Sequence, residues 1–357
     1  MRIRPEDLYP PAAGRPARRP IDVRSPGEVA RGALPGAVAL PILDDDERHA
    51  VGLTYAQEGQ AAAVAVGERV TEPHMHARRA AWRDAADAEL SAFVCWRGGM
   101  RSDLARTLSE RLDVPTVEGG YKAIRRHLMD AVAPSLARRT PFVLTGPTGS
   151  GKTELLRALA GREELLALDL EGAAEHRGSA FGATGPQPAQ ATFEHRLALP
   201  LLLGREATLL LEDESRNVGS VHLPAAVFDV VRSAPLVRLE TSDDARVRRI
   251  HAEYAAAPAR REGVAAARAT LSAAIRRLKR RLGGAATERM VAVLEDAEAQ
   301  GAWFDPQAFR PVILPLLHDY YDPLYRKATP DEGRTVAVRG DEGEVRSWIE
   351  MRAREAA

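Results

Sequence analysis

A glycine-rich segment at residues 146–153, Gly-Pro-Thr-Gly-Ser-Gly-Lys-Thr, limits the fold of this chain more than anything else in its sequence. It fits the pattern G-x-x-x-x-G-K-[ST], follows the apolar run 142–144 and precedes a helix-forming stretch at 152–160. Between a strand and a helix, such a loop turns backbone N–H groups toward an anion, and its lysine adds a positive charge. This context predicts a parallel α/β domain that binds phosphate. The candidate phosphate ligands are Gly146, Thr148, Gly149, Ser150, Gly151, Lys152 and Thr153.

An acidic strand end supplies a candidate metal site for the same loop. The apolar run 208–211 ends in Glu212, Asp213 and Glu214. An acid at this place commonly binds Mg²⁺ together with the Ser or Thr of the loop. We predict Mg²⁺ on Thr153 and one of the acids, and we favour Asp213. The loop recognises a di- or triphosphate group, which does not specify ATP, because a diphosphate ester of another alcohol fits equally well.

A second candidate site surrounds Cys95, the single cysteine of the chain. The apolar run 92–94 precedes it and a helix-forming stretch follows, so the sulfur is expected at the carboxyl end of a parallel strand, where open α/β sheets bind ligands. Free backbone amides, a helix N-terminus and two guanidinium groups would favour a thiolate or an anionic substrate. The candidate catalytic residues are Cys95, Arg97, Gly98, Gly99, Arg101 and Ser102.

The cysteine loop fits two chemistries. Cys-x₅-Arg is the spacing of cysteine-dependent phosphatases, and rhodanese-type sulfurtransferases hold a persulfide in a similar loop. Residues 22–28 and 32–37 resemble the opening of a rhodanese domain, and residues 117–122 resemble its final glycine turn. These three matches favour transfer of sulfur or selenium over phosphatase chemistry without excluding the phosphatase.

Composition limits the class of protein. A chain of 357 residues has room for two or three domains. Its 50 basic and 50 acidic residues give zero formal net charge, so a polyanion must bind a local patch. A single cysteine cannot form an intramolecular disulfide. The charged N-terminus has no signal-peptide pattern, and no segment has the roughly 20 apolar residues of a membrane span, so we expect a cytoplasmic protein without membrane contact.

We predict an α/β fold with two parallel-sheet domains and a helical region. Residues 1–135 are expected to form a rhodanese-like domain, residues 136–245 a P-loop NTPase-like domain, and residues 246–357 a mainly helical region that contacts RNA. A linker is expected at 134–141, because prolines at both of its ends discourage helix continuation. One amphipathic helix is expected over 262–282, ending at a Gly-Gly pair.

Local charge in the last region predicts a nucleic-acid surface. Residues 246–281 contain eleven basic residues and two acidic ones. The predicted helix would place five of the basic side chains on its solvent face, where they can contact a phosphate backbone. Lysine is rare, with four among the 50 basic residues, so each lysine invites a functional explanation. The five candidates are Arg276, Arg277, Lys279, Arg280 and Arg281.

The order of these motifs resembles the bacterial tRNA 2-selenouridine synthase family over nearly the whole chain. Beyond the two loops, the resemblance includes residues 44–52, 169–182, 187–190, 193–194, 212–216 and 320–325. One departure is Ala56 after Tyr55, where the family pattern has a lysine and where we expect a peripheral anion contact to be lost.

The resemblance implies a transferase that replaces sulfur by selenium in 2-thiouridine at the tRNA wobble position, with selenophosphate as donor. It also implies an S-geranyl intermediate made from geranyl diphosphate. Both donors would be co-substrates, with Mg²⁺ the only cofactor expected. Cys95 would carry selenium as a selanyl adduct held by Arg97 and Arg101, and Lys152 would stabilise the departing diphosphate. Contacts to substrate or RNA are further expected at His176, Arg177, Ser179 and Arg216.

Two other functions stay open on the sequence. The first is a P-loop NTPase or kinase with a regulatory domain of rhodanese or cysteine-phosphatase type, which would release phosphate from ATP. The second is a non-catalytic RNA-binding adaptor, which would bind tRNA and leave its nucleosides unchanged.

Overall fold

The computed structural model describes residues 1–10, 16–176, 186–328 and 333–356, and within them the chain forms two compact units. The prediction divides the chain into three parts after residues 135 and 245. Instead, residues 188–205 belong to the first unit, and residues 246–357 belong to the second rather than standing alone. The first unit is Met1–Arg138 with Pro188–Arg205, and the second is Arg139–Gln187 with Glu206–Ala357.

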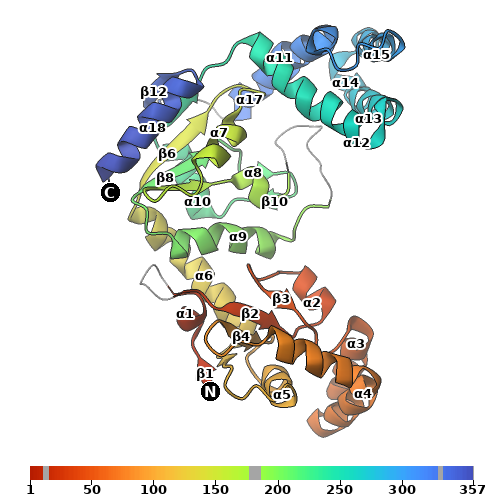
Figure 1. Cartoon of the computed structure of the whole chain (residues 1–357), viewed down its shortest axis with the longest axis vertical. Coiled ribbons are helices and arrows are strands. Elements are labelled where there is room, and N and C mark those ends of the chain that lie inside the picture. The colour runs from red at the N-terminus through yellow and green to blue at the C-terminus, as the bar shows by residue number, and fades with distance from the viewer. Residues whose placement is uncertain (11–15, 177–185, 329–332, 357) are drawn as a thin grey trace. The chain divides into compact units, whose positions relative to one another are not determined.

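A five-stranded sheet forms the centre of the first unit (Figure 1). Its order is β1-β5-β4-β2-β3 and every neighbouring pair is parallel, so the predicted α/β class is confirmed here. The strand β4 is buried along its whole length and leads into Cys95. The strands are β1 (Arg2–Ile3), β2 (Arg19–Asp22), β3 (Val38–Ala39), β4 (Ser91–Val94) and β5 (Thr116–Val117).

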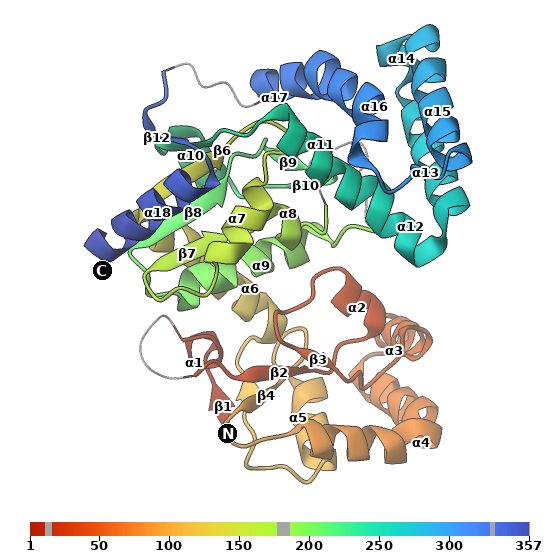
Figure 2. The ribbon, with the colours of Figure 1, turned by 45° about the horizontal axis from the view of Figure 1, so that its top comes forward.

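Helices connect these strands and complete the core. Asp44 caps α3 by accepting from the Glu47 N–H, and Glu47 accepts from the Asp44 N–H in return. Trp82 of α4 is fully buried, and its indole N–H donates to Leu40 O at 2.9 Å. The helices α3 and α4 lie side by side (Figure 2). The helices are α1 (Pro5–Leu8), α2 (Pro26–Ala30), α3 (Asp45–Glu58), α4 (Gln60–Ala85), α5 (Met100–Leu108), α6 (Gly120–Ala137) and α9 (Gln190–Leu203).

The helix α9 belongs to the first unit although its residues follow the phosphate loop in sequence. It lies beside α6 (Figure 1). The Ala33 N–H donates to Thr192 Oγ1 at 2.9 Å, and His195 Nδ1 lies 2.9 Å from Ala33 O. Burial lowers the pKa of His195 to about 4, so its imidazole is neutral near pH 7. An ion pair of 2.5 Å between Arg125 and Glu194 further joins α6 to α9.

The predicted linker at 134–141 contains the boundary between the two units, which falls after Arg138, but Pro134 does not end the helix as expected. Helix α6 continues through Pro134 to Ala137, and the strand β6 begins at Thr140. Proline removes one helical hydrogen bond, but α6 buries an apolar face along its length, and this packing outweighs the lost bond.

A buried ion pair between Asp22 and Arg24 yields a stability prediction. Both side chains are fully buried, the shortest N–O distance is 2.6 Å, and the guanidinium lies 3.9 Å over the Tyr121 ring. Replacing Asp22 by asparagine leaves a buried charge without its counter-charge, so the free energy of unfolding should fall by about 3–5 kcal/mol. Urea unfolding followed by circular dichroism measures this change. The double variant Asp22→Asn/Arg24→Met should recover part of the loss; equal unfolding of Asp22→Asn and the unaltered chain would contradict the expectation.

The second unit has a parallel sheet of its own, in the order β12-β11-β6-β8-β7. The strand β6 lies between β11 and β8 and runs into the phosphate loop. The last strand and helix, β12 and α18, come from the region predicted to be helical; α18 packs against β12 and β11 (Figure 1). The strands are β6 (Thr140–Thr145), β7 (Leu165–Leu168), β8 (Thr208–Glu212), β11 (Leu236–Leu239) and β12 (Val336–Gly340), with an antiparallel pair β9 (Asn217–Val218) and β10 (Val221–His222).

The helices α7 (Lys152–Leu159), α10 (Ala225–Ser233) and α18 (Glu342–Ala356) pack against the sheet of the second unit, and the short helix α8 (Leu170–Ala173) follows β7. A helical group follows β11 and gathers at one end of this unit (Figure 2). Two of its segments, 252–256 and 316–321, are π-helical. The other members are α11 (Asp243–His251), α12 (Ala257–Glu262), α13 (Val264–Arg277), α14 (Lys279–Leu282), α15 (Gly284–Ala299), a 3₁₀ turn (Pro306–Phe309), α16 (Arg310–Pro315) and α17 (Asp322–Ala328).

The single helix predicted over 262–282 is interrupted twice. Gly263 has φ 88°, a left-handed value that ends α12 and starts α13. A second break falls at Leu278, between α13 and α14. Among the described helices, none combines the length and the apolar character needed to cross a bilayer.

Candidate active site

The phosphate loop joins β6 to α7, as predicted. Gly149 and Gly151 have φ of 77° and 95°, which side chains with a Cβ rarely adopt, so the bend requires glycine there. The Lys152 ammonium donates to Gly146 O at 2.8 Å and lies 4.8 Å from the centre of the Tyr325 ring. The predicted ligands therefore share one strand-to-helix turn, with the lysine folded back over it.

Two arginines of α11 hold the carbonyl groups of this loop. Arg246 Nε donates to Thr148 O, and Arg249 Nη1 donates to Ser150 O, both at 2.9 Å. Carbonyl oxygens held in this way are prevented from turning toward a bound anion, which they would repel. The sequence analysis counts both arginines among the eleven basic residues of 246–281 and gives them no role of their own. The structure assigns them to the phosphate loop, and only the packing of α11 on the loop reveals it.

Acidic side chains surround the threonine of the loop. Thr153 Oγ1 donates to Glu212 Oε1 at 2.6 Å and to Glu171 Oε2 at 3.2 Å. Burial, followed by the charge of Glu171, raises the pKa of Glu212 above its ordinary value. Hydroxyl and carboxylate oxygens are the ligands that Mg²⁺ prefers, and a cation would relieve the repulsion between the acids. The residues present therefore fit Mg²⁺.

Asp213, the acid favoured from the sequence, makes other contacts. Its carboxylate is fully buried, accepts from Thr145 Oγ1 at 2.9 Å and pairs with Arg334 at 3.2 Å and Arg232 at 3.5 Å. These partners compensate its charge inside the unit. Glu212 replaces Asp213 as the acid in contact with Thr153, because adjacent residues of a strand point to opposite faces of its sheet.

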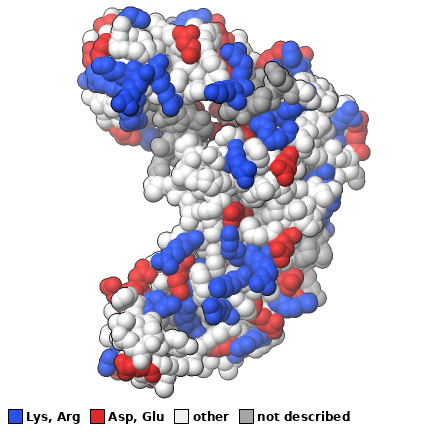
Figure 3. Space-filling model, turned by 180° about the vertical axis from the view of Figure 1, so that it is seen from behind, with Lys and Arg blue, Asp and Glu red and all other residues white. Residues whose placement is uncertain are grey.

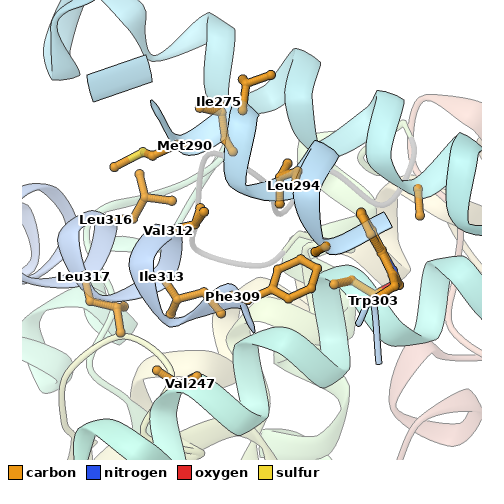
Figure 4. Close-up of a cluster of buried hydrophobic side chains, with 14 of the residues drawn as sticks. Val247, Ile275, Met290, Leu294, Trp303, Phe309, Val312, Ile313, Leu316 and Leu317 are labelled. Atoms are coloured by element: carbon orange, nitrogen blue, oxygen red, sulfur yellow. The ribbon is translucent and has the colours of Figure 1, made fainter. Parts of the chain in front are cut away.

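An apolar cavity of about 110 Å³ borders the phosphate loop. The loop contributes Thr148 and Gly149 to its wall. Both π-helical segments also line it, and irregular helical turns of this kind often occur at functional sites. Figure 4 shows the apolar side chains of this region converging from several helices. Lining side chains include Ile250, Leu271, Ile275, Leu294, Phe309 and Ile313.

Cys95 lies at the carboxyl end of β4, as predicted, with 3 % of its surface exposed. The Gly99 N–H donates to Sγ at 3.3 Å, and Ser102 Oγ lies 3.3 Å from it. The glycine turn packs directly on this loop: a Cβ on Gly98 would lie 2.3 Å from Val117 O. A backbone amide and a hydroxyl are therefore placed to stabilise negative charge on the sulfur.

The two arginines of the cysteine loop differ in their surroundings. Arg101 pairs with Glu28 at 2.5 Å. Although burial opposes ionisation of Glu28, its hydrogen bond with Arg101 and the charge of that arginine hold its pKa below the usual value. Arg97 is exposed and has no acidic partner among the residues that the structure describes. Arg97 thus remains available to an anionic substrate, while the charge of Arg101 is already compensated.

The predicted RNA-binding residues are only partly accounted for. The five basic candidates of α13 and α14 (276, 277, 279, 280 and 281) are all exposed, and Figure 3 shows Lys and Arg side chains gathered on the helical group. Arg281 also contacts the Tyr320 hydroxyl. Arg216 is exposed 5.7 Å from the Phe228 ring, and His176 is partly buried. Arg177 and Ser179 lie outside the described residues.

The fold and the two loops define an α/β protein class with a cysteine site on one parallel sheet and a phosphate site on another. The profile of the tRNA 2-selenouridine synthase AAA domain matches residues 139–356. The chain therefore belongs to the tRNA 2-selenouridine synthase family.

Its relatives match nearly the whole chain. The tRNA 2-selenouridine synthase of Cupriavidus necator is 41 % identical over 92 % of this chain and 93 % of its own. That of Cronobacter sakazakii is 41 % identical over 93 % and 92 %, and that of Pseudomonas aeruginosa 38 % identical over 93 % and 94 %. The crystal structure of an N-terminal domain from Clostridium difficile 630 matches 36 % of this chain and 97 % of its own with 26 % identity, but a TM-score of 0.31 supports no statement about fold.

Proposed function

We propose that this chain converts 2-thiouridine to 2-selenouridine at the wobble position of tRNA, in two steps. The observation that best supports this function is that one chain of this family combines two sites of different chemistry: a phosphate loop beside an apolar cavity, and a cysteine loop. A thiocarbonyl sulfur leaves poorly as sulfide, whereas an alkylated sulfur leaves as a thiol. Alkylation before selenium transfer therefore lowers the barrier of the second step.

The first step would use geranyl diphosphate. The sulfur of 2-thiouridine attacks the allylic carbon, a C–S bond forms, the C–O bond to diphosphate breaks, and the pyrimidine loses its N–H proton. Backbone N–H groups of residues 146–153 and the Lys152 ammonium are suited to stabilise charge on the departing diphosphate. The cavity bordered by Thr148 and Gly149 offers an apolar site for the hydrocarbon chain.

Thr153 and Glu212 are the residues that would hold Mg²⁺. When bound, the ion would neutralise charge on the diphosphate oxygens. Together with the Lys152 ammonium, this chain would supply one fixed cation and a hydroxyl–carboxylate pair for a second.

The second step would use selenophosphate, and its electron balance limits the role of Cys95. A selanyl adduct on Sγ is two electrons more oxidised than the selenium of selenophosphate, so forming it would need an oxidant. We therefore propose that Sγ attacks phosphorus: the S–P bond forms, the P–Se bond breaks, and selenide is released beside the loop. Selenide then attacks the pyrimidine C2, geranylthiol leaves, and water hydrolyses the S–P bond to phosphate.

The decisive experiment is nucleoside mass spectrometry of thiolated tRNA after incubation with the protein, selenophosphate, geranyl diphosphate and Mg²⁺. We expect S-geranyl-2-thiouridine without selenophosphate and 2-selenouridine with it. Unchanged nucleosides would overturn the proposal. Rapid phosphate release from ATP under the same conditions would instead favour the NTPase or kinase.

Filling the apolar cavity should impair alkylation alone. Leu271 lines the cavity and is only partly buried. Leu271→Trp should raise the KM for geranyl diphosphate at least about tenfold, since the larger ring occupies the site of the hydrocarbon chain. Leu271→Met keeps the volume and serves as the matched control. Steady-state kinetics and calorimetric binding of inorganic diphosphate test this. An unchanged KM for geranyl diphosphate in Leu271→Trp would contradict binding of the hydrocarbon chain in this cavity. A loss of affinity for inorganic diphosphate as large as the rise in KM would contradict it as well.

A further inference from the structure

A basic groove beside the cysteine loop has no role in the chemistry described above. It lies within the first unit, encloses about 550 Å³, and is lined by side chains of the cysteine loop, α6 and α9 together with one residue that follows α2. Its walls include four basic side chains and two aromatic rings and no acidic side chain. They are Arg31, Lys122, Arg125, Arg126, Trp96 and Tyr121.

Most of this positive charge is uncompensated. Arg31, Lys122 and Arg126 are exposed, and none of them has an acidic partner among the described residues. Arg125 differs, because it pairs with Glu194 at 2.5 Å. Lys122 is one of only four lysines in the chain and ends the segment 117–122 that resembles the final glycine turn of a rhodanese domain. Three free cations around one groove attract a chain of phosphates more strongly than a single anion.

The aromatic wall adds a feature that a phosphate site does not require. Trp96 is partly exposed and stacks on Tyr121, with ring centres 5.1 Å apart and 23° between their planes. Tyr121 is in turn fixed by the guanidinium of Arg24 at 3.9 Å. An indole held rigidly at the edge of a basic groove is a platform on which a base can stack. Cations and a stacking surface together favour single-stranded RNA over an acidic protein segment.

The groove is also connected to the reacting sulfur through the backbone. Trp96 directly follows Cys95, the Tyr121 N–H donates to Cys95 O at 2.9 Å, and the Lys122 N–H donates to Trp96 O at 3.3 Å. A nucleotide that contacts these side chains therefore lies next to the cysteine loop.

We propose that this groove binds the phosphate backbone of an unpaired RNA segment and stacks one of its bases on Trp96. That this RNA is tRNA rests on the function proposed above. That the groove binds RNA rests only on its basic and aromatic side chains. None of the basic residues 276–281 lines this groove, and they belong to the second unit, so each unit would have an RNA-binding surface of its own.

The test is RNA binding without selenophosphate or geranyl diphosphate, measured by fluorescence anisotropy with the full chain and an anticodon stem-loop across a salt series. Lys122→Ala/Arg126→Ala should weaken binding at least about tenfold and reduce the slope of log affinity against log salt by about 1.4, the change expected for two lost phosphate contacts to a single strand. Trp96→Ala should weaken binding roughly tenfold with little change in slope.

Arg69→Ala/Arg79→Ala is the matched control, because it removes the same charge from exposed positions of α4 outside the groove. Equal effects of the two double variants would overturn the proposal, as would an unchanged slope in Lys122→Ala/Arg126→Ala. The binding assay measures no catalysis, so it is independent of the nucleoside assay described above. If binding depends on the groove but the tRNA nucleosides stay unchanged in that assay, the proposed function is rejected and the groove is supported. Normal 2-selenouridine formation with groove-independent binding would do the reverse.

Discussion

Cys95→Ala is expected to lose selenium transfer by at least about 1,000-fold while S-geranyl-2-thiouridine accumulates in the tRNA. The variant removes the only thiol of the chain and changes no residue of the second unit, which contains the phosphate loop and the cavity. Alkylation should therefore proceed at its normal rate and stop at the intermediate. Nucleoside mass spectrometry of the two products over time measures both rates in one reaction.

A second measurement on the same variant tests the form of the intermediate on Cys95. Intact-protein mass spectrometry after a short exposure to selenophosphate should show a phosphoryl adduct that is absent from Cys95→Ala. The isotope pattern of selenium in that adduct would instead establish the selanyl form and require an oxidant. Undiminished 2-selenouridine in Cys95→Ala would remove the cysteine from the mechanism altogether.

Lys152→Ala should show the opposite defect. It removes the ammonium that folds over the phosphate loop, so alkylation should slow by roughly 100- to 1,000-fold, the effect of losing one charge-stabilising donor. tRNA that already carries S-geranyl-2-thiouridine should still be converted to 2-selenouridine at a normal rate. Supplying that tRNA to the variant therefore separates the two steps.

Lys327→Ala is the matched control for this change, because Lys327 is an exposed lysine of α17 in the same unit. It should alkylate normally. Slow conversion of pre-geranylated tRNA by Lys152→Ala would show that the phosphate loop acts in selenium transfer as well, and it would contradict the assignment of one step to each loop.

The sequence predicted the two loops well because each is a local device. A buried strand, a glycine turn and a helix are specified within about fifteen residues, and the side chains that matter are part of the turn. For this reason Cys95 and Lys152 lie where the motifs place them, each on a parallel sheet. Exposure of the basic face at 276–281 was also predictable from helical periodicity, even though Leu278 interrupts the helix.

The groups that support the loops depend on contacts distant in sequence. Glu212 rather than Asp213 contacts Thr153 because of the way β8 faces that residue. The order of the acidic residues at the end of the strand does not reveal which of them faces Thr153. In the sequence, Arg246 and Arg249 cannot be distinguished from surface arginines, and only the packing of α11 against the phosphate loop shows their role. The compensation of Arg101 by Glu28 likewise needs two segments that are 73 residues apart in the sequence. Each of these required the tertiary structure.

The position of α9 constrains how the protein can be made. Ala33, early in the chain, bonds to Thr192 and lies against His195, yet these residues are synthesised after the phosphate loop. During synthesis on the ribosome, the side of α6 that α9 covers therefore stays exposed until β6, α7 and β7 have been made and α9 follows them. A fragment ending at residue 138 should for the same reason expose the side of α6 that α9 covers and be poorly soluble. Adding α9 as a separate peptide should restore its solubility.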